Sequence, residues 1–337
     1  EAPYTFQDLP DSLQQKWLDT IKHTEANRYP PQLSQVAINK LYKFLNLPEG
    51  MGFIPGNGSD EIIMLLMLLC GTARGGKVLS PSPSFSMYGH LTKALGGEFI
   101  EVDLENDFTL DLNKFAQAIK EHKPQLVFLA QPNNPTGNLF SNEAVKLAAE
   151  LLSDSGLVVV DRAYEFFLKE LDVSGDYTKQ ANVINLYTLS KIGLAGLRFG
   201  FAATGGEIIH ELSKLRLPYN INSLTCASIE VMADNLDCFR KHADNIITNR
   251  DELISELEKL DGIQIFPSST NFILLRLLGG SSAECFKYLQ QHKVLVKDFD
   301  GYHHLMQNCL RVSIGKPEEN TLFLKNLSAY LGLQTNS

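Results

Sequence analysis

The stretch QLVFLAQPNNPTG, residues 125–137, joins a continuous apolar run to a turn rich in proline, asparagine and glycine. An unbroken apolar run of this length is typical of a β-strand that is buried on both faces. The turn places Asn133 and Asn134 directly after the strand, while its two prolines and its glycine fix the course of the loop. A plain turn explains the prolines and the glycine, but it does not explain two adjacent asparagines.

Similar apolar runs alternate with helical patterns on both sides of this stretch. The runs are KVLS (77–80), FIEVDL (99–104), GLVVVD (156–161), VINLYTL (183–189) and FGFAAT (199–204). Helices are predicted between them, near residues 87–95, after Asp111 and over residues 142–153. This alternation predicts an α/β fold, in which a mostly parallel sheet is sandwiched by helices.

The last third of the chain has a different pattern. Residues 222–260 predict one long helical region, either continuous or broken. After it, the runs IQIF (263–266), NFILLRL (271–277), VLVK (294–297) and CLRVSIG (309–315) intermix with helices near 282–291 and 317–331. We therefore expect a smaller α+β lobe packed closely on the first, with 30–245 as the large domain and 1–29 plus 246–337 as the small one.

Composition argues against several classes of partner. The formal net charge of −9 and the scattered lysines and arginines disfavour nucleic acid, and the most apolar stretch, residues 62–70, is too short to cross a membrane. Five widely spaced cysteines form no CxxC pair and indicate reduced thiols in a cytoplasmic protein. No basic-then-apolar leader opens the sequence, so we expect a soluble protein. The abrupt, extended-looking start EAPYTF leaves room for further residues upstream of Glu1.

Two motifs resemble known sites but fail a required feature. The segment GTARGGK, residues 71–77, has the glycines and lysine of a P-loop, but Val78 stands where Ser or Thr is required, so a turn is predicted. His303 and His304 are adjacent and cannot reproduce the i, i+4 spacing of helical zinc ligands, and no HExxH occurs. We expect no metal.

Reactive groups follow three predicted strands, where open parallel sheets bind their ligands: the asparagine pair after QLVFLA, Asp161 and Lys191. Asp161 ends the apolar run GLVVV, and Tyr164 follows three residues later. A carboxylate buried there needs a cationic partner, such as a protonated pyridine nitrogen. An aspartate that caps the next element explains the same residue equally well. Lys191 ends TLSK and precedes GLAGLRFG (193–200). A lysine away from bulk water would have a depressed pKa and a neutral amine suited to Schiff-base chemistry, whereas most lysines are solvated surface groups.

A fourth segment, Asn57-Gly-Ser-Asp-Glu61, precedes the apolar helix IIMLLMLLC. Flexible backbone, a hydroxyl and a helix amino end together make an anion site, although an N-cap with acidic first-turn residues explains the same letters.

The order and intervals of NNPTG, D-x-A-Y, TLSK and GLAGLRFG resemble the class I and II aminotransferases of pyridoxal-phosphate (PLP) fold type I, the aspartate-aminotransferase-like fold. The match spans nearly the whole chain. The resemblance implies that Lys191 forms the Schiff base with PLP, that Asp161 pairs with the pyridinium nitrogen, and that Asn134 and Tyr164 bond the phenolic oxygen. It further implies that Phe85 stacks on the ring, and that the PLP phosphate is held by Ser59, the backbone of Asp60, Ser190 and Arg198.

Within this superfamily the chain is most similar to histidinol-phosphate aminotransferases. The similarity lies in EAPY, Asn27-Arg-Tyr-Pro30, GNGSDE, Leu215-Arg-Leu-Pro-Tyr-Asn-Ile-Asn222 and NCLRVSIGKPEEN. It implies that Tyr29 reaches the cofactor phosphate of a neighbouring subunit, so that a homodimer with shared active sites is required. The implied substrate-binding residues are Arg311, whose guanidinium suits a carboxylate or phosphate, together with Lys297, Tyr29 and Asn134.

Two positions depart from that family: Arg162 stands where glutamate is usual, and Tyr187 where arginine is usual. The implied reaction interconverts histidinol phosphate and 2-oxoglutarate with imidazole-acetol phosphate and glutamate, in histidine biosynthesis. The alternatives are a threonine-phosphate decarboxylase-like PLP lyase, an aromatic amino acid aminotransferase, and a PLP-binding regulator. The last predicts a basic DNA-binding domain at the amino end, and none is found within residues 1–337.

Overall fold

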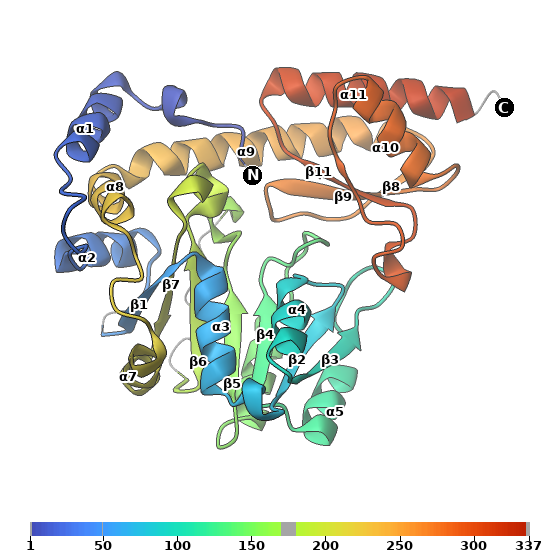
Figure 1. The fold of residues 1–337 in the computed structure, drawn as a ribbon. Coiled ribbons are helices and arrows are strands. Elements are labelled where there is room, and N and C mark those ends of the chain that lie inside the picture. Colours follow the sequence, from blue (N-terminus) through green and yellow to red (C-terminus); the bar gives the residue numbers. More distant parts are fainter. Residues whose placement is uncertain (1, 49, 170–179, 335–337) are drawn as a thin grey trace.

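The computed structural model describes residues 2–48, 50–169 and 180–334. Its larger part is a seven-stranded sheet in the order β1-β7-β6-β5-β4-β2-β3 (Figure 1). The strands are β1 (Gly52–Asn57), β2 (Lys77–Ser82), β3 (Glu98–Asp103), β4 (Leu126–Ala130), β5 (Leu157–Asp161), β6 (Val183–Thr188) and β7 (Phe199–Thr204). Only β7 runs against the others, because it pairs antiparallel with both β1 and β6. The predicted mostly parallel sheet is confirmed.

Helices cover both faces of this sheet. One face carries α3 (Ser59–Leu69), α4 (Met87–Ala94) and α7 (Gly206–Leu215), and the other carries α5 (Leu112–His122) and α6 (Asn142–Leu151). Successive strand residues point to opposite faces of the sheet. Phe128 and Val159 therefore pack in the core beneath α3, α4 and α7, while Leu129 and Val158 pack in the core beneath α5 and α6. This two-sided burial explains why the strands are continuous apolar runs.

The smaller lobe is an antiparallel sheet in the order β10-β11-β9-β8. Its strands are β8 (Ile263–Ile265), β9 (Phe272–Leu277), β10 (Lys297–Asp298) and β11 (Cys309–Ser313), packed with α10 (Ser282–Gln291) and α11 (Pro317–Gln334). The predicted α+β lobe is confirmed, but the predicted strand over 294–297 is wrong in extent. The Val294 N–H donates to the Leu289 carbonyl and closes the end of α10, so it cannot join a ladder, and Leu295 is 75% exposed.

The predicted helical region over 222–260 is two helices, α8 (Ser223–Ala233) and α9 (Leu236–Leu257). α9 passes along both lobes in Figure 1. The amino-terminal helices α1 (Asp11–Lys22) and α2 (Gln35–Phe44) contact α8, and the Trp17 indole donates to Ser228 Oγ at 2.8 Å. The proposed boundary at residue 245 falls inside α9, and the division into 30–245 and the remainder stays a proposal.

Short 3-10 helices join several of these elements. They are η1 (Phe6–Asp8), η2 (Thr72–Arg74), η3 (Glu165–Phe167), η5 (Ser190–Ile192), η6 (Ala195–Leu197) and η7 (His304–Met306). The GTARGGK segment contains η2 and connects α3 to β2, as the prediction of a turn requires.

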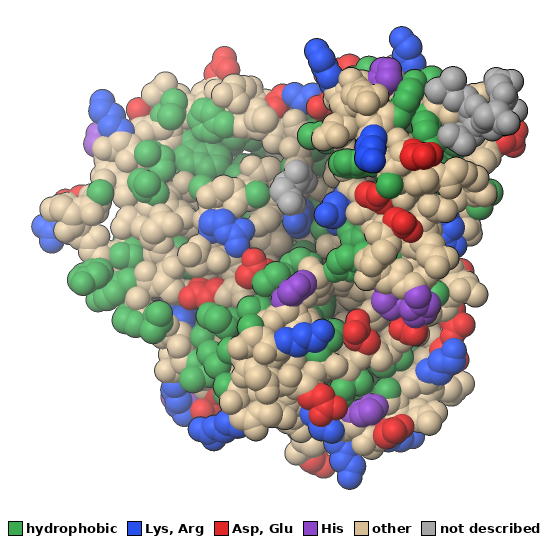
Figure 2. Space-filling model, turned by 45° about the vertical axis from the view of Figure 1, so that its right-hand side comes forward, with side chains coloured by type: hydrophobic (Ala, Val, Ile, Leu, Met, Phe, Trp, Pro, Cys, Tyr) green, Lys and Arg blue, Asp and Glu red, His purple; other side chains and the backbone are tan. Residues whose placement is uncertain are grey.

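The surface and the thiols agree with the composition. Lys and Arg side chains are interspersed with Asp and Glu side chains on the face shown in Figure 2. All five cysteines lie in described segments and are free thiols. Within the described ranges, each helix is too short or too polar to span a lipid bilayer.

Candidate active site

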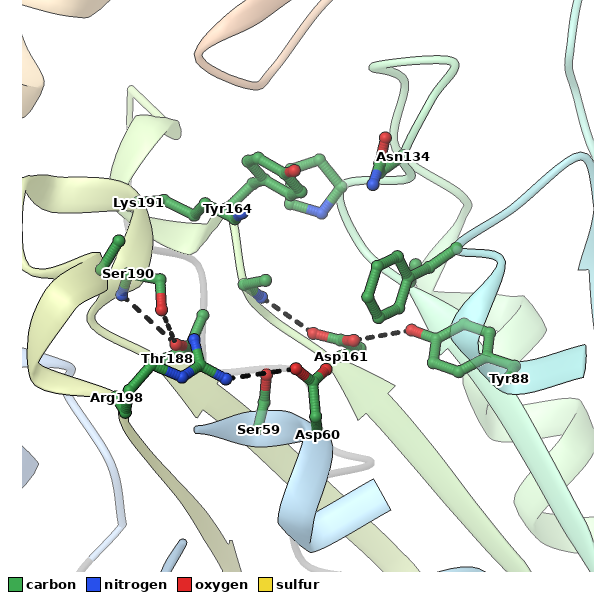
Figure 3. Close-up of a pocket in the computed structure, with 15 residues that line it drawn as sticks. Ser59, Asp60, Tyr88, Asn134, Asp161, Tyr164, Thr188, Ser190, Lys191 and Arg198 are labelled. Atoms are coloured by element: carbon green, nitrogen blue, oxygen red, sulfur yellow. Dashed lines mark hydrogen bonds and ion pairs between the residues drawn. The ribbon is translucent and has the colours of Figure 1, made fainter. Parts of the chain in front are cut away.

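A cavity of about 420 Å³ lies at the carboxyl ends of β4, β5 and β6, where the sheet presents its loops (Figure 3). It brings together residues that are up to 139 positions apart in the sequence, from Ser59 to Arg198. Nine predicted cofactor-binding residues line it: Ser59, Asp60, Phe85, Asn134, Asp161, Tyr164, Ser190, Lys191 and Arg198. A volume of this size suits a small-molecule ligand.

Asp161 is the buried carboxylate of the cavity, with 5% of its surface exposed. Its Oδ1 accepts a hydrogen bond from the Ala163 N–H at 3.0 Å, and its Oδ2 accepts one from the Tyr88 hydroxyl at 2.6 Å. Burial raises the pKa of the Asp161 carboxyl, and these two donors oppose the rise. Asp161 thus makes a local turn contact with Ala163 and also lines the cavity, and its pairing with a ring nitrogen stays a prediction.

Lys191 lies on η5, directly after β6, and is half-buried. Its Nζ is 5.6 Å from the centre of the Tyr164 ring. In Figure 3, Lys191, Tyr164 and Asn134 lie along one edge of the cavity and Asp161 lies near its middle. An amine and a carboxylate therefore border one enclosed space, as the predicted Schiff-base site requires.

The amino end of α3 forms the other end of the cavity. A Cβ at Gly58 would lie 2.5 Å from Arg198 Nη2, and one at Gly200 would lie 2.5 Å from the Ser59 backbone nitrogen. The two glycines thus leave room for the Arg198 guanidinium and for the Ser59 N–H group, and both residues line the cavity. Arg198 Nη2 also contacts Asp60 Oδ2 at 3.3 Å. Helix amino ends and arginines both bind phosphate, so this end is an anion cradle.

The two asparagines of NNPTG have different roles. Asn133 is fully buried and donates to the Pro83 carbonyl at 3.0 Å and to Thr136 Oγ1 at 2.7 Å, so it ties two loops together. Asn134 faces the cavity, and its Oδ1 accepts from Arg311 Nη1 at 2.5 Å. Only Asn134 is available to a ligand.

Arg311 reaches the cavity from the small lobe through that bond with Asn134. Its guanidinium carbon lies 4.9 Å from the centre of the Phe272 ring and 5.4 Å from that of Phe299. Lys297 pairs with Arg311 across β10 and β11, and its Nζ is 6.0 Å from the Phe299 ring. Among the described residues, no carboxylate forms an ion pair with either cation. The pair can therefore accept an anionic group.

Tyr29 does not line the cavity of its own chain. It is 78% exposed and stacks on Tyr219, with ring centres 4.4 Å apart, in a separate hollow that also contains Pro30, Pro218 and Leu224.

The two departures from the family pattern lie outside the cavity lining. Arg162, which is 2% exposed, pairs with Glu165 Oε2 at 2.7 Å and donates through Nε to Asn185 Oδ1 at 2.9 Å. Tyr187 is buried and stacks on Phe201, with ring centres 5.0 Å apart. Arg162 therefore supports the strand ends that carry Asp161 without lining the cavity itself.

The adjacent histidines meet a carboxylate that the sequence pattern did not reveal. His303 Nε2 lies 3.2 Å and His304 Nε2 lies 3.5 Å from the oxygens of Asp103. The Leu305 N–H donates to His303 Nδ1, which puts the ring proton on Nε2, toward Asp103. Hydrogen bonding accounts for this cluster, and the absence of a metal stays a prediction.

Sequence reasoning missed Tyr88 and Thr188, which also line the cavity. Tyr88 follows Phe85 by three residues, a spacing that puts both on one side of a helical turn, and this was the available signal. Thr188 Oγ1 lies 2.8 Å from Ser190 Oγ and orders the turn that carries Lys191.

Residues 4–327 match the family model of aminotransferase class I and II. The chain belongs to this family. It is 41% identical over 332 residues, 98% of its length and 89% of the relative's, to histidinol-phosphate aminotransferase 2 of Nitrosococcus oceani. The resemblance inferred from the motifs is confirmed.

Two solved structures share the fold. One is histidinol-phosphate aminotransferase from Sinorhizobium meliloti in complex with pyridoxal-5'-phosphate, with TM-score 0.83, 20% identity and coverage of 98% of this chain and 90% of that one. The other is L-threonine-O-3-phosphate decarboxylase from Porphyromonas gingivalis, with TM-score 0.75, 23% identity and coverage of 96% and 95%. The aminotransferase-like PLP fold is therefore confirmed.

The Sinorhizobium meliloti structure, which shares this fold, holds pyridoxal-5'-phosphate, the cofactor that the motifs of this chain predict. The cavity fits it in chemical type: the anion cradle suits its phosphate, and the buried Asp161 suits its ring nitrogen. The amine of Lys191 suits its aldehyde.

Proposed function

We propose that this aminotransferase interconverts histidinol phosphate and 2-oxoglutarate with imidazole-acetol phosphate and glutamate, in histidine biosynthesis. The observation that carries the proposal is the single cavity bordered by Lys191, Asp161 and the cradle at Arg198. The name of the Nitrosococcus oceani relative supports the choice of substrate. It disfavours the decarboxylase and the aromatic aminotransferase.

Each residue of the cavity has a proposed part in this reaction. PLP, when bound, supplies the electron sink. Asp161 holds the proton of the ring nitrogen, while Asn134 and Tyr164 hydrogen-bond the phenolic oxygen. The amine of Lys191 would take the proton from the substrate α-carbon as a general base and pass it to C4′ of the cofactor as a general acid. The other contacts are assigned to Phe85 on the ring face and to Ser59, Asp60, Ser190 and Arg198 at the phosphate.

The substrate phosphate is assigned to Arg311 and Lys297. The two cations are cross-strand neighbours beside Asn134, and no carboxylate among the described residues pairs with them. Arg311 also suits the carboxylate of glutamate or 2-oxoglutarate, because a guanidinium binds either anion through two parallel hydrogen bonds. One site would thus serve both halves of the reaction. We place the protein in the cytoplasm.

The PLP-loaded protein should form glutamate from histidinol phosphate and 2-oxoglutarate. The measurement is a coupled assay with glutamate dehydrogenase, run beside O-phosphothreonine and aromatic amino acids. Glutamate formation should be fastest with histidinol phosphate. Carbon dioxide release from O-phosphothreonine, with no glutamate from histidinol phosphate, would assign the protein to the lyases instead.

We further propose a homodimer in which Tyr29 completes the site of the partner subunit. Tyr29 is exposed, aromatic and outside its own cavity, and its stacking on Tyr219 presents both rings on the surface. Symmetric dimers commonly bury such surfaces reciprocally.

Mixing the Tyr29→Ala and Lys191→Ala proteins, with dissociation and reassociation, should restore activity. Each mixed dimer would hold one site with both residues intact, so about a quarter of all sites would be active in an equal mixture. The measurement is glutamate formation before and after subunit exchange. The control pairs Tyr29→Ala with the double variant, and activity no higher than in that control would contradict shared sites.

A further inference from the structure

The buried end of the cavity contains a tyrosine that the reaction has not yet used. Tyr88, on α4, donates its hydroxyl proton to Asp161 Oδ2 at 2.6 Å, and Figure 3 draws this contact beside the cavity. The other carboxylate oxygen accepts from the Ala163 backbone. Tyr88 is therefore the side-chain hydrogen-bond donor that the described residues give to Asp161.

The surrounding side chains fix the position of this hydroxyl. The Tyr88 ring stacks on Phe128 of β4, with ring centres 4.3 Å apart and planes 9° apart. Its edge meets Phe85, with ring centres 5.5 Å apart and planes at 85°. Tyr88 is fully buried, and the Thr92 hydroxyl donates to its backbone carbonyl at 2.7 Å. A ring that is packed in this way holds its hydroxyl at one place.

Asp161 has opposing influences on its charge. Burial favours the protonated form, and Asp60 adds to that effect, whereas the donors Tyr88 and Ala163 and the cation Lys191 favour the carboxylate. Burial and the nearby Asp161 carboxylate raise the pKa of Tyr88 well above its ordinary value, so the tyrosine remains a neutral donor. Only the carboxylate form of Asp161 can hold a cationic ring nitrogen.

We propose that Tyr88 is a positioning residue that fixes the Asp161 carboxylate and keeps it charged, so that it can bind the protonated ring nitrogen of PLP. The inference rests on the proposed function, because it assumes that PLP occupies the cavity. It goes beyond that function because it makes the position and charge of the Asp161 carboxylate depend on a residue of α4. Tyr88 acts through Asp161 and need not touch the substrate.

The test compares Tyr88→Phe with Tyr42→Phe in the full chain without PLP. Tyr42 is the matched control, because its hydroxyl also makes one hydrogen bond, to the Met51 carbonyl, and does not line the cavity. Carbon-13 NMR of protein labelled at aspartate Cγ follows the titration of Asp161, which the Asp161→Asn variant identifies. The pKa of Asp161 should rise by roughly one pH unit in Tyr88→Phe and stay unchanged in Tyr42→Phe.

PLP binding supplies a second readout. The dissociation constant of PLP is measured by fluorescence titration of the apoprotein. It should rise about tenfold in Tyr88→Phe and stay unchanged in Tyr42→Phe. If Tyr88→Phe does not fold, 2,3-difluorotyrosine at position 88 keeps the ring and strengthens the donor, and it should lower the pKa of Asp161. If the Asp161 titration is unchanged in Tyr88→Phe, or in the difluorotyrosine protein where that one is used, the inference is overturned. Absent transamination in the unaltered protein would instead overturn the proposed function.

Discussion

The Lys191→Ala protein should keep its fold and lose transamination by roughly 10⁴-fold. The amine at this position has two tasks in the proposed reaction: it bonds the cofactor aldehyde, and it moves the proton at the substrate α-carbon. Alanine can do neither. The fold should survive because Lys191 is only half-buried and lies on the short 3-10 turn η5, outside the apolar core clusters.

The measurement is single-turnover absorbance of the bound cofactor after histidinol phosphate is added. Circular dichroism before the reaction checks the fold. Lys214→Ala is the matched control, because Lys214 is an exposed lysine on α7 that contacts Glu211 and does not line the cavity. Full turnover by Lys191→Ala would rule out the assigned role of this amine.

Most of the fold could be predicted because the sheet is buried on both faces. Its strands are unbroken apolar runs, and the helices between them carry the amphipathic pattern of a surface layer. The exception is β1, whose sequence GFIPGN contains two glycines and a proline, residues that are rare inside strands. It pairs with β7 at the edge of the sheet, where tertiary contacts outweigh its weak propensity.

The site was predictable to the extent that it depends on chain position. Parallel strands end at one edge of the sheet, so Asn134, Asp161 and Lys191 had to meet there. Side-chain direction within the loops was not predictable. Asn133 turns inward because the Pro83 carbonyl of a distant loop accepts its amide proton. The contact between Tyr88 and Asp161 depends likewise on the packing of α4, since the two residues are 73 positions apart.

Arg162 shows the same limit for a charged residue. The sequence marked it only as an unusual neighbour of Asp161, because a pattern of letters does not reveal whether an arginine is solvated. In the structure its guanidinium and the Glu165 carboxylate, which is fully buried, form an ion pair three residues apart, and Asn185 accepts from its Nε. Arg162 and Glu165 flank the turn that carries Tyr164, so their pairing holds the turn against β6.

Arg162→Ala should therefore destabilise the protein by roughly 3–5 kcal/mol, since it removes the cation that the Glu165 carboxylate pairs with in a place that water cannot reach. Urea unfolding should show a lower midpoint with an unchanged slope. The double variant Arg162→Met with Glu165→Leu removes both charges and keeps most of the volume, so it should lie much nearer the unaltered protein. Equal losses in the single and double variants would show that packing, rather than the buried charge, governs this site. At a temperature where both proteins are folded, Arg162→Ala should retain far more activity than Asp161→Ala, because only Asp161 borders the cavity.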